Sequence, residues 1–140
     1  MEEFISAIDK ANITPEGDVI NLNGGISKVN KGGGTDGKAG NGSDDTGPNG
    51  LPCVTSKIVI NGNGATIERL RATGTPDFRI FEVTSTGNLT LYDLTIQNGR
   101  IVAPNGGANG GGGGSFGGGI FNNGGTVKLQ LCFRLHSMNL

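Results

Sequence analysis

The chain has 140 residues, of which 28 are glycine, 34% are hydrophobic and none is tryptophan. We therefore expect one domain with a small, mostly aliphatic core. The formal net charge of −1 gives no electrostatic reason to expect nucleic acid or an anionic membrane as a partner. No apolar run approaches the roughly 18 residues that a membrane-spanning helix needs, so no membrane span is predicted.

The first residues predict a short amphipathic helix followed by a strand. Apolar residues recur at helical spacing on one face: Phe4, Ile5, Ile8 and Ala11. A Thr-Pro-Glu-Gly turn at residues 14–17 ends this helix, and residues 18–22 read as the first strand. We expect the helix to cap the first strand and to keep its edge from pairing with other chains.

One strand pattern occurs more than once in the sequence. Residues 87–91 (Gly-Asn-Leu-Thr-Leu) correspond to residues 125–129 (Gly-Thr-Val-Lys-Leu), each after an Ile-Phe pair, and residues 57–62 are a weaker copy. Self-similar short strands separated by Gly and Asn are typical of a solenoid, in which each repeat buries its apolar face against its neighbours.

Two arrangements of the strands fit the turns. Strands are predicted at residues 18–22, 54–60, 65–68, 79–83, 88–91, 94–97 and 127–131. Asn-Gly dipeptides between or after them would suit the type I′ hairpins of an antiparallel β-sandwich. The short segments and the uneven turns favour a coil of parallel strands, in which Asn and Gly occupy the corners. We predict the parallel coil and keep the sandwich as the alternative.

Two long glycine-rich stretches, residues 31–50 and 100–119, are predicted to be mobile loops because they cannot bury enough apolar area to offset their ordering. The second contains a G-x-G-x-x-G pattern, but no strand leads into it and no helix follows, so we assign no phosphate site. The first contains Asp36, Asp44 and Asp45 without the spacing of a calcium loop. A solvated loop is predicted there, with weak calcium binding as the alternative.

The remaining polar residues do not form a recognisable catalytic pattern. Carboxylates lie on or beside strands near arginines: Glu68, Asp77, Glu82 and Asp93, with Arg69, Arg71 and Arg79. A glycosidase needs two carboxylates at a set separation, whereas these are scattered singly and fit outward-facing ion pairs equally well. His136 is the only histidine, and no Ser-His-Asp arrangement can be built around it. We assign no catalytic, cofactor-binding or metal-ligating residue and expect no cofactor.

The two cysteines give little information. Cys53 and Cys132 are 79 residues apart and do not have the spacing of a metal site. We predict buried or free thiols, and a disulfide between them stays an open alternative.

Three stretches resemble a known group of proteins. Residues 4–22 resemble the N-terminal segment of bacterial CSLREA-type surface proteins, and residues 50–67 resemble the rung that follows it there. Residues 117–129 are similar to the "GGGIYN.GGTLTL" repeat of polymorphic outer-membrane proteins. The resemblance implies an all-β fold: a right-handed, single-stranded, pectate-lyase-like parallel β-helix with a short N-terminal capping helix.

The same resemblance implies a domain organisation and a function. Residues 1–131 would be the capped N-terminal part of the β-helix, and residues 132–140 a tail outside the coil, as in a truncated or frame-shifted product. The chain would be a structural or adhesive module of a secreted or surface-displayed bacterial protein. Its loops would contact a glycan or a host or cell-surface protein, and its uncapped C-terminal end would self-associate.

An alternative function is a non-catalytic N-terminal fragment of a polysaccharide-acting enzyme, either a lyase or a glycoside hydrolase. The start of the chain lacks the basic and apolar segments of a signal peptide. We therefore expect either a cytosolic chain or an internal piece of a longer secreted protein. The resemblance favours an extracellular or cell-surface location.

Overall fold

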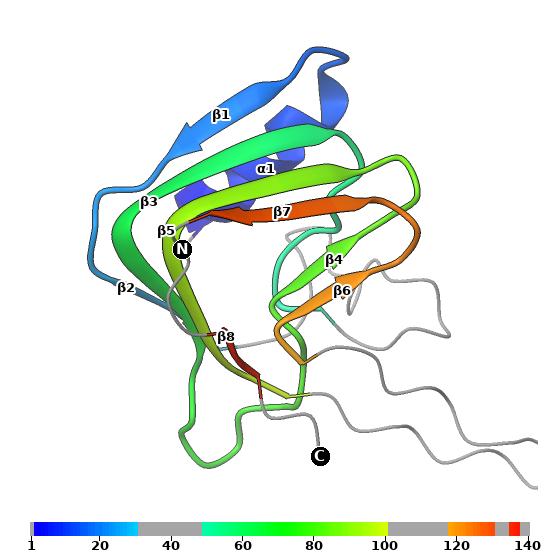
Figure 1. Ribbon diagram of the computed structural model, residues 1–140. Coiled ribbons are helices and arrows are strands. Elements are labelled where there is room, and N and C mark those ends of the chain that lie inside the picture. Colours follow the sequence, from blue (N-terminus) through cyan, green and yellow to red (C-terminus); the bar gives the residue numbers. More distant parts are fainter. Residues whose placement is uncertain (1, 31–48, 101–117, 131–134, 138–140) are drawn as a thin grey trace, which may run out of the picture.

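The computed structural model describes residues 2–30, 49–100, 118–130 and 135–137 (Figure 1). Its elements are α1 (Glu2–Ile13), β1 (Asp18–Asn21), β2 (Ile26–Val29), β3 (Lys57–Arg69), β4 (Phe81–Val83), β5 (Asn88–Gly99), β6 (Ile120–Asn122), β7 (Thr126–Gln130) and β8 (Leu135–Ser137). Most of the two predicted glycine-rich loops, residues 31–48 and 101–117, lies outside the described residues. Asp36, Asp44, Asp45 and Cys132 lie outside them as well.

The strands form two parallel sheets. A six-stranded sheet has the order β1-β3-β5-β7, with β2 also paired to β3 and β8 also paired to β5. A two-stranded sheet pairs β4 with β6, and Figure 1 shows it beside the larger sheet. Each of these strand pairs is parallel, which agrees with the preference for parallel strands over hairpins.

The copies of the strand pattern lie side by side in register. Ile58 on β3 is the partner of Leu89 on β5, and Leu89 is the partner of Val127 on β7. Residues two positions further along each strand pair in the same way. The sequence similarity between residues 57–62, 87–91 and 125–129 therefore corresponds to direct strand neighbours.

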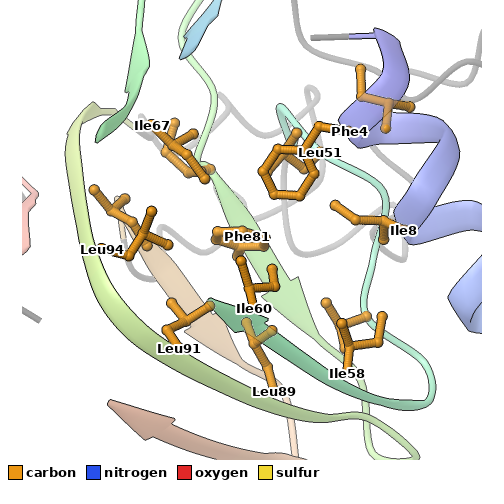
Figure 2. Packing of buried hydrophobic residues seen from close by; sticks show 14 of the residues in the cluster. Phe4, Ile8, Leu51, Ile58, Ile60, Ile67, Phe81, Leu89, Leu91 and Leu94 are labelled. Carbon is orange, nitrogen blue, oxygen red and sulfur yellow. The ribbon is translucent and has the colours of Figure 1, made fainter. Parts of the chain in front are cut away.

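The predicted apolar face of the helix is confirmed, and it is buried in the core. The four residues are between 0% and 9% exposed: Phe4, Ile5, Ile8 and Ala11. The Phe4 ring lies 6.5 Å from the Phe81 ring, centroid to centroid, with the planes tilted by 55°. Figure 2 shows Phe4 and Ile8 facing the aliphatic side chains of β3 and β5 across the core. The helix thus supplies one wall of the core, against strands that supply the other.

This arrangement corrects the predicted fold class. We predicted an all-β single-stranded parallel β-helix, but the described residues form a mixed structure with a six-stranded parallel sheet, a separate two-stranded sheet and a 12-residue helix. No closed solenoid is present among these residues. The prediction treated α1 as an end cap and not as a contributor to the core, which four of its side chains enter.

The prediction also divided two long strands into short ones. β3 has 13 residues and β5 has 12, whereas the predicted strands in these regions had four to seven residues. Asn63 and Asp93 have φ values of 52° and 47°, in the left-handed region that Asn and Asp tolerate better than most residues. The pairing of β3 with β5 shifts register between Asn61 and Ala65, beside Asn63. Each strand is therefore bent at this point, but it is not ended.

Candidate functional site

The first glycine-rich segment, residues 31–48, is flanked by Val29 and Gly50, which lie close to each other. The Gly50 N–H donates to the Arg79 carbonyl at 2.6 Å, just after the segment. Val29 lies just before it and is 2% exposed. A Cβ on Gly50 would lie 2.8 Å from the Phe78 ring and 3.1 Å from Val29 Cγ1. Gly50, on one side of the segment, therefore packs against both the Phe78 ring and Val29 on the other side, at a point where only glycine fits.

The second glycine-rich segment, residues 101–117, is flanked by residues that reach the same run of chain. The Arg100 N–H donates to the Phe78 carbonyl at 2.9 Å. On the other side of the segment, the Gly119 carbonyl accepts the N–H of Phe81 at 2.9 Å. A Cβ on Gly99 would lie 1.9 Å from the Gly118 carbonyl oxygen, so the two flanks are in close contact. We call residues 78–81 the anchor run, because residues that flank both segments are hydrogen-bonded to it.

A buried ionic group lies directly beside the anchor run. Arg79 is 0% exposed and Glu82 is 1% exposed, and Arg79 Nη1 lies 3.8 Å from Glu82 Oε2. The Arg79 guanidinium also lies over the Phe121 ring of β6, 4.9 Å from its centroid. Burial lowers the pKa of Arg79, and the charge of Glu82 opposes that shift. The interior therefore contains a buried ion pair, whose arginine also contacts an aromatic face.

Glu82 connects this pair to two further segments. The Asn49 amide donates to Glu82 Oε2 at 2.7 Å and to the Cys53 sulfur at 3.3 Å. The Asn123 amide donates to Glu82 Oε1 at 3.3 Å. We call these residues the Glu82 cluster: Asn49, Cys53, Arg79, Glu82, Phe121 and Asn123. The cluster joins the chain after the first glycine-rich segment to the chain after the second.

The Glu82 cluster is built as a structural unit and lacks an activated nucleophile. Burial, and next the charge of Glu82, raise the pKa of Cys53 to about 11, so the thiol stays protonated near neutral pH. Cys53 is a free, buried cysteine. The Glu82 carboxylate is almost fully buried and already binds Arg79, Asn49 and Asn123. Neither group has the exposure that a reacting group needs.

The four carboxylates singled out from the sequence have separate environments. Glu82 is buried in the cluster, and Asp93 is exposed at the bend of β5. Asp77 pairs with Arg100 at 3.6 Å on the surface. Glu68 on β3 accepts a hydrogen bond from Gln97 on β5 at 2.5 Å. Within the described ranges, no group of three or more His, Cys, Asp and Glu side chains could hold a metal ion.

The arginines also have different roles. Arg69 Nε donates to the Asn98 carbonyl at 2.9 Å, and Arg69 Nη1 donates to the Pro76 carbonyl at 3.1 Å. This side chain ties the turn after β3 to the end of β5. Arg71 is exposed, whereas Arg79 is buried in the Glu82 cluster. His136 lies on β8, which pairs with β5.

Sequence reasoning missed most of the Glu82 cluster. Asn49 and Cys53 come from one segment and Phe121 and Asn123 from another, and the repeat that contains Phe121 and Asn123 says nothing about their partners. One signal was available: Arg79 and Glu82 stand inside the otherwise apolar run from Phe78 to Val83. Opposite charges within such a run indicate a buried pair, because an unpaired buried charge is costly.

The comparisons with known proteins give no relative. No family model matches the chain, and no curated protein or solved structure matches it either. Among the described residues there is no helix long and apolar enough to cross a membrane. Any inference about the function of this protein therefore depends on the arrangement of the anchor run and the Glu82 cluster.

Proposed function

We propose that the chain is a non-catalytic structural module that displays its two glycine-rich segments for adhesion. The observation that carries this proposal is the shared anchor run: residues flanking both segments are hydrogen-bonded to residues 78–81. Segments held at one place on a rigid core can act together on one partner, because little additional ordering of their ends is needed on binding.

The buried cluster supports the same reading. Arg79 takes part twice: its carbonyl accepts the Gly50 N–H, and its guanidinium pairs with Glu82. The interior of the protein thus fixes the positions from which the two segments leave. A scaffold that presents variable loops from a rigid core is a common way to build a binding surface.

The partner we propose is a glycan or a protein at the surface of a bacterium or its host. This part of the proposal is supported by the resemblance of residues 4–22 and 117–129 to bacterial surface proteins. Residues 101–117 contain no charged side chain, and residues 31–48 contain charges of both signs without a basic excess. Both segments therefore suit polar ligands better than nucleic acid, and the net charge of −1 agrees with that choice.

A binding experiment with matched variants tests the proposal. In one variant, residues 33–46 and 103–115 are replaced by short Gly-Ser linkers. In the control, the same residues are shuffled so that their length and composition are kept. Binding to glycan arrays and to a panel of surface proteins should be lost in the first variant and weakened in the second, with unchanged circular dichroism in both.

Two results would argue against the display function. Binding that survives in the linker variant would show that the glycine-rich segments are not the contact surface. Turnover of pectin-type or alginate-type polysaccharide that disappears in Asp77→Ala or Asp93→Ala would establish an enzyme instead.

A further inference from the structure

Asparagine followed by glycine recurs along this chain, and this dipeptide is prone to spontaneous deamidation because glycine has no side chain to hinder the reaction. The glycine backbone nitrogen attacks the carbonyl carbon of the asparagine side chain, and the side-chain nitrogen takes up the N–H proton and leaves as ammonia. Water then opens the succinimide ring to aspartate or isoaspartate. The described residues contain six such asparagines: Asn23, Asn49, Asn61, Asn63, Asn98 and Asn123.

The Glu82 cluster holds two of these asparagines. Asn49 is 0% exposed, and its amide donates to Glu82 Oε2 at 2.7 Å. The N–H of Gly50, which would be the attacking group, donates to the Arg79 carbonyl at 2.6 Å. The Asn123 amide donates to Glu82 Oε1 at 3.3 Å. Reaction at either asparagine would therefore first have to break contacts of the cluster.

The glycines after two further asparagines, Gly62 and Gly99, are buried against other backbone segments. A Cβ on Gly62 would lie 2.3 Å from the Asp93 carbonyl oxygen, and a Cβ on Gly99 would lie 1.9 Å from the Gly118 carbonyl oxygen. The backbone cannot turn toward the preceding asparagine side chain at these positions without displacing a neighbouring segment. The packing of the fold therefore protects Asn61 and Asn98 as well.

The two remaining asparagines, Asn23 and Asn63, lie together at the bend of the large sheet. Both are exposed, and so are the glycines that follow them. Asn63 Nδ2 donates to the Leu22 carbonyl at 2.7 Å, and a Cβ on Gly24 would lie 3.4 Å from the Asn63 carbonyl oxygen. Figure 1 shows the connection from β1 to β2 beside the bend of β3. Water therefore reaches both asparagines at one place on the surface.

The backbone at this bend lies outside the strand ladders. The register of β3 with β5 passes from Asn61 to Ala65 and leaves out residues 62–64. On the other side of the bend, residues 22–25 lie between β1 and β2. A Cβ on Gly64 would meet no heavy atom of the described residues within 4 Å. Segments with few such restraints open locally at low free energy, so the glycine nitrogen can reach the asparagine side chain here.

We propose that this bend is a deamidation site of the folded protein, at Asn23 and Asn63, and that the fold protects the other four asparagines. Each conversion replaces a neutral amide by a carboxylate and so adds one negative charge to the bend. At Asn63 it also removes the N–H that binds the Leu22 carbonyl and leaves a carboxylate beside that oxygen. The modified chain therefore holds the end of β1 less firmly to β3.

Ageing of the full chain in native buffer and in urea tests the proposal. After incubation at mildly alkaline pH, tandem mass spectrometry of the digested chain locates each mass gain of about one dalton. Isoaspartyl methyltransferase with labelled S-adenosylmethionine detects the isoaspartate product.

In native buffer, Asn23 and Asn63 should convert while the other four asparagines stay intact. In urea all six should convert, because the dipeptide is the same and the protection depends on the fold. A native chain in which Asn23 or Asn63 stays intact, or in which the other four convert equally fast, would overturn the proposal.

Two variants test the consequence for the fold. Asn63→Asp places the carboxylate of the product beside the Leu22 carbonyl. Asn23→Asp is the matched control, because it adds the same charge at the same bend and leaves the bond between Asn63 and Leu22 in place. The urea midpoint should fall for Asn63→Asp and change less for Asn23→Asp. Equal midpoints would show that deamidation does not loosen the contact between β1 and β3.

Discussion

The Glu82→Gln variant removes one charge from the centre of the Glu82 cluster and leaves the side-chain volume almost unchanged. Glu82 and Arg79 are 1% and 0% exposed, so the arginine would keep its charge with almost no access to water. Removing one partner of a buried ion pair costs about 3–5 kcal/mol. The separation of 3.8 Å and the Phe121 ring at 4.9 Å favour the lower limit. We therefore expect a loss of about 3 kcal/mol in the free energy of unfolding.

Urea unfolding followed by far-ultraviolet circular dichroism measures this loss, with the slope of the transition as a check on two-state behaviour. Asp77→Asn is the matched control, because it removes one charge from an ion pair on the surface. The Asp77–Arg100 pair has a separation of 3.6 Å and side chains that are 37% and 55% exposed. Its loss should cost less than about 1 kcal/mol.

A double variant separates the cost of an unpaired charge from the loss of packing. Arg79→Met combined with Glu82→Gln removes both charges and keeps an apolar side chain over the Phe121 ring. Since replacing a whole buried pair is often close to neutral, the double variant should be more stable than Glu82→Gln alone. A Glu82→Gln loss below about 1 kcal/mol, or a double variant that is less stable than the single one, would refute the reasoning.

Three further changes test other parts of the structure. Gly50→Ala should cost about 1–3 kcal/mol, because the added methyl carbon would lie 2.8 Å from the Phe78 ring; an unchanged urea midpoint would contradict this. Asp93→Val should cost about 1–3 kcal/mol and Asp93→Gly much less, since φ is 47° there; equal losses would exclude backbone strain as the cause. Burial and the charge of Glu82 raise the pKa of Cys53 from 9.0 to about 11, so the folded state holds this proton more tightly than the unfolded state. The resulting stabilisation is complete below about pH 9 and is lost as the pH rises to about 11. Urea titrations of a Cys53→Ala variant should lack this component, and identical pH dependence in both proteins would count against it.

The elements that the sequence predicted well are those with a local pattern. The spacing of Phe4, Ile5, Ile8 and Ala11 defines one face of a helix, and that face is buried. The similarity between residues 87–91 and 125–129 predicted neighbouring parallel strands, which pair in register. The helix face follows from the burial of a periodic set of apolar side chains, and the strand pairing follows from the self-similarity of neighbouring repeats.

The features that could not be predicted depend on contacts between distant segments. Asn63 and Asp93 look like turn residues, and only the pairing of β3 with β5 on both sides of them shows that the strands continue. Asn49 acquires its role through a carboxylate 33 positions away in the sequence. Propensity and spacing contain no information about such partners, so the Glu82 cluster became visible only in the folded chain.

The cluster and the glycine-rich segments are coupled through single residues. The carbonyl of Arg79 holds Gly50, while its guanidinium is held by Glu82 and Phe121. Asn49 precedes Gly50 and binds Glu82 directly. The polar groups in this core therefore hold the residues that flank the two segments. An aliphatic core of the same size would lack these hydrogen bonds and ion pairs. A module that binds through displayed segments benefits from such connections, because a rigid core then fixes the positions of the residues that flank the segments.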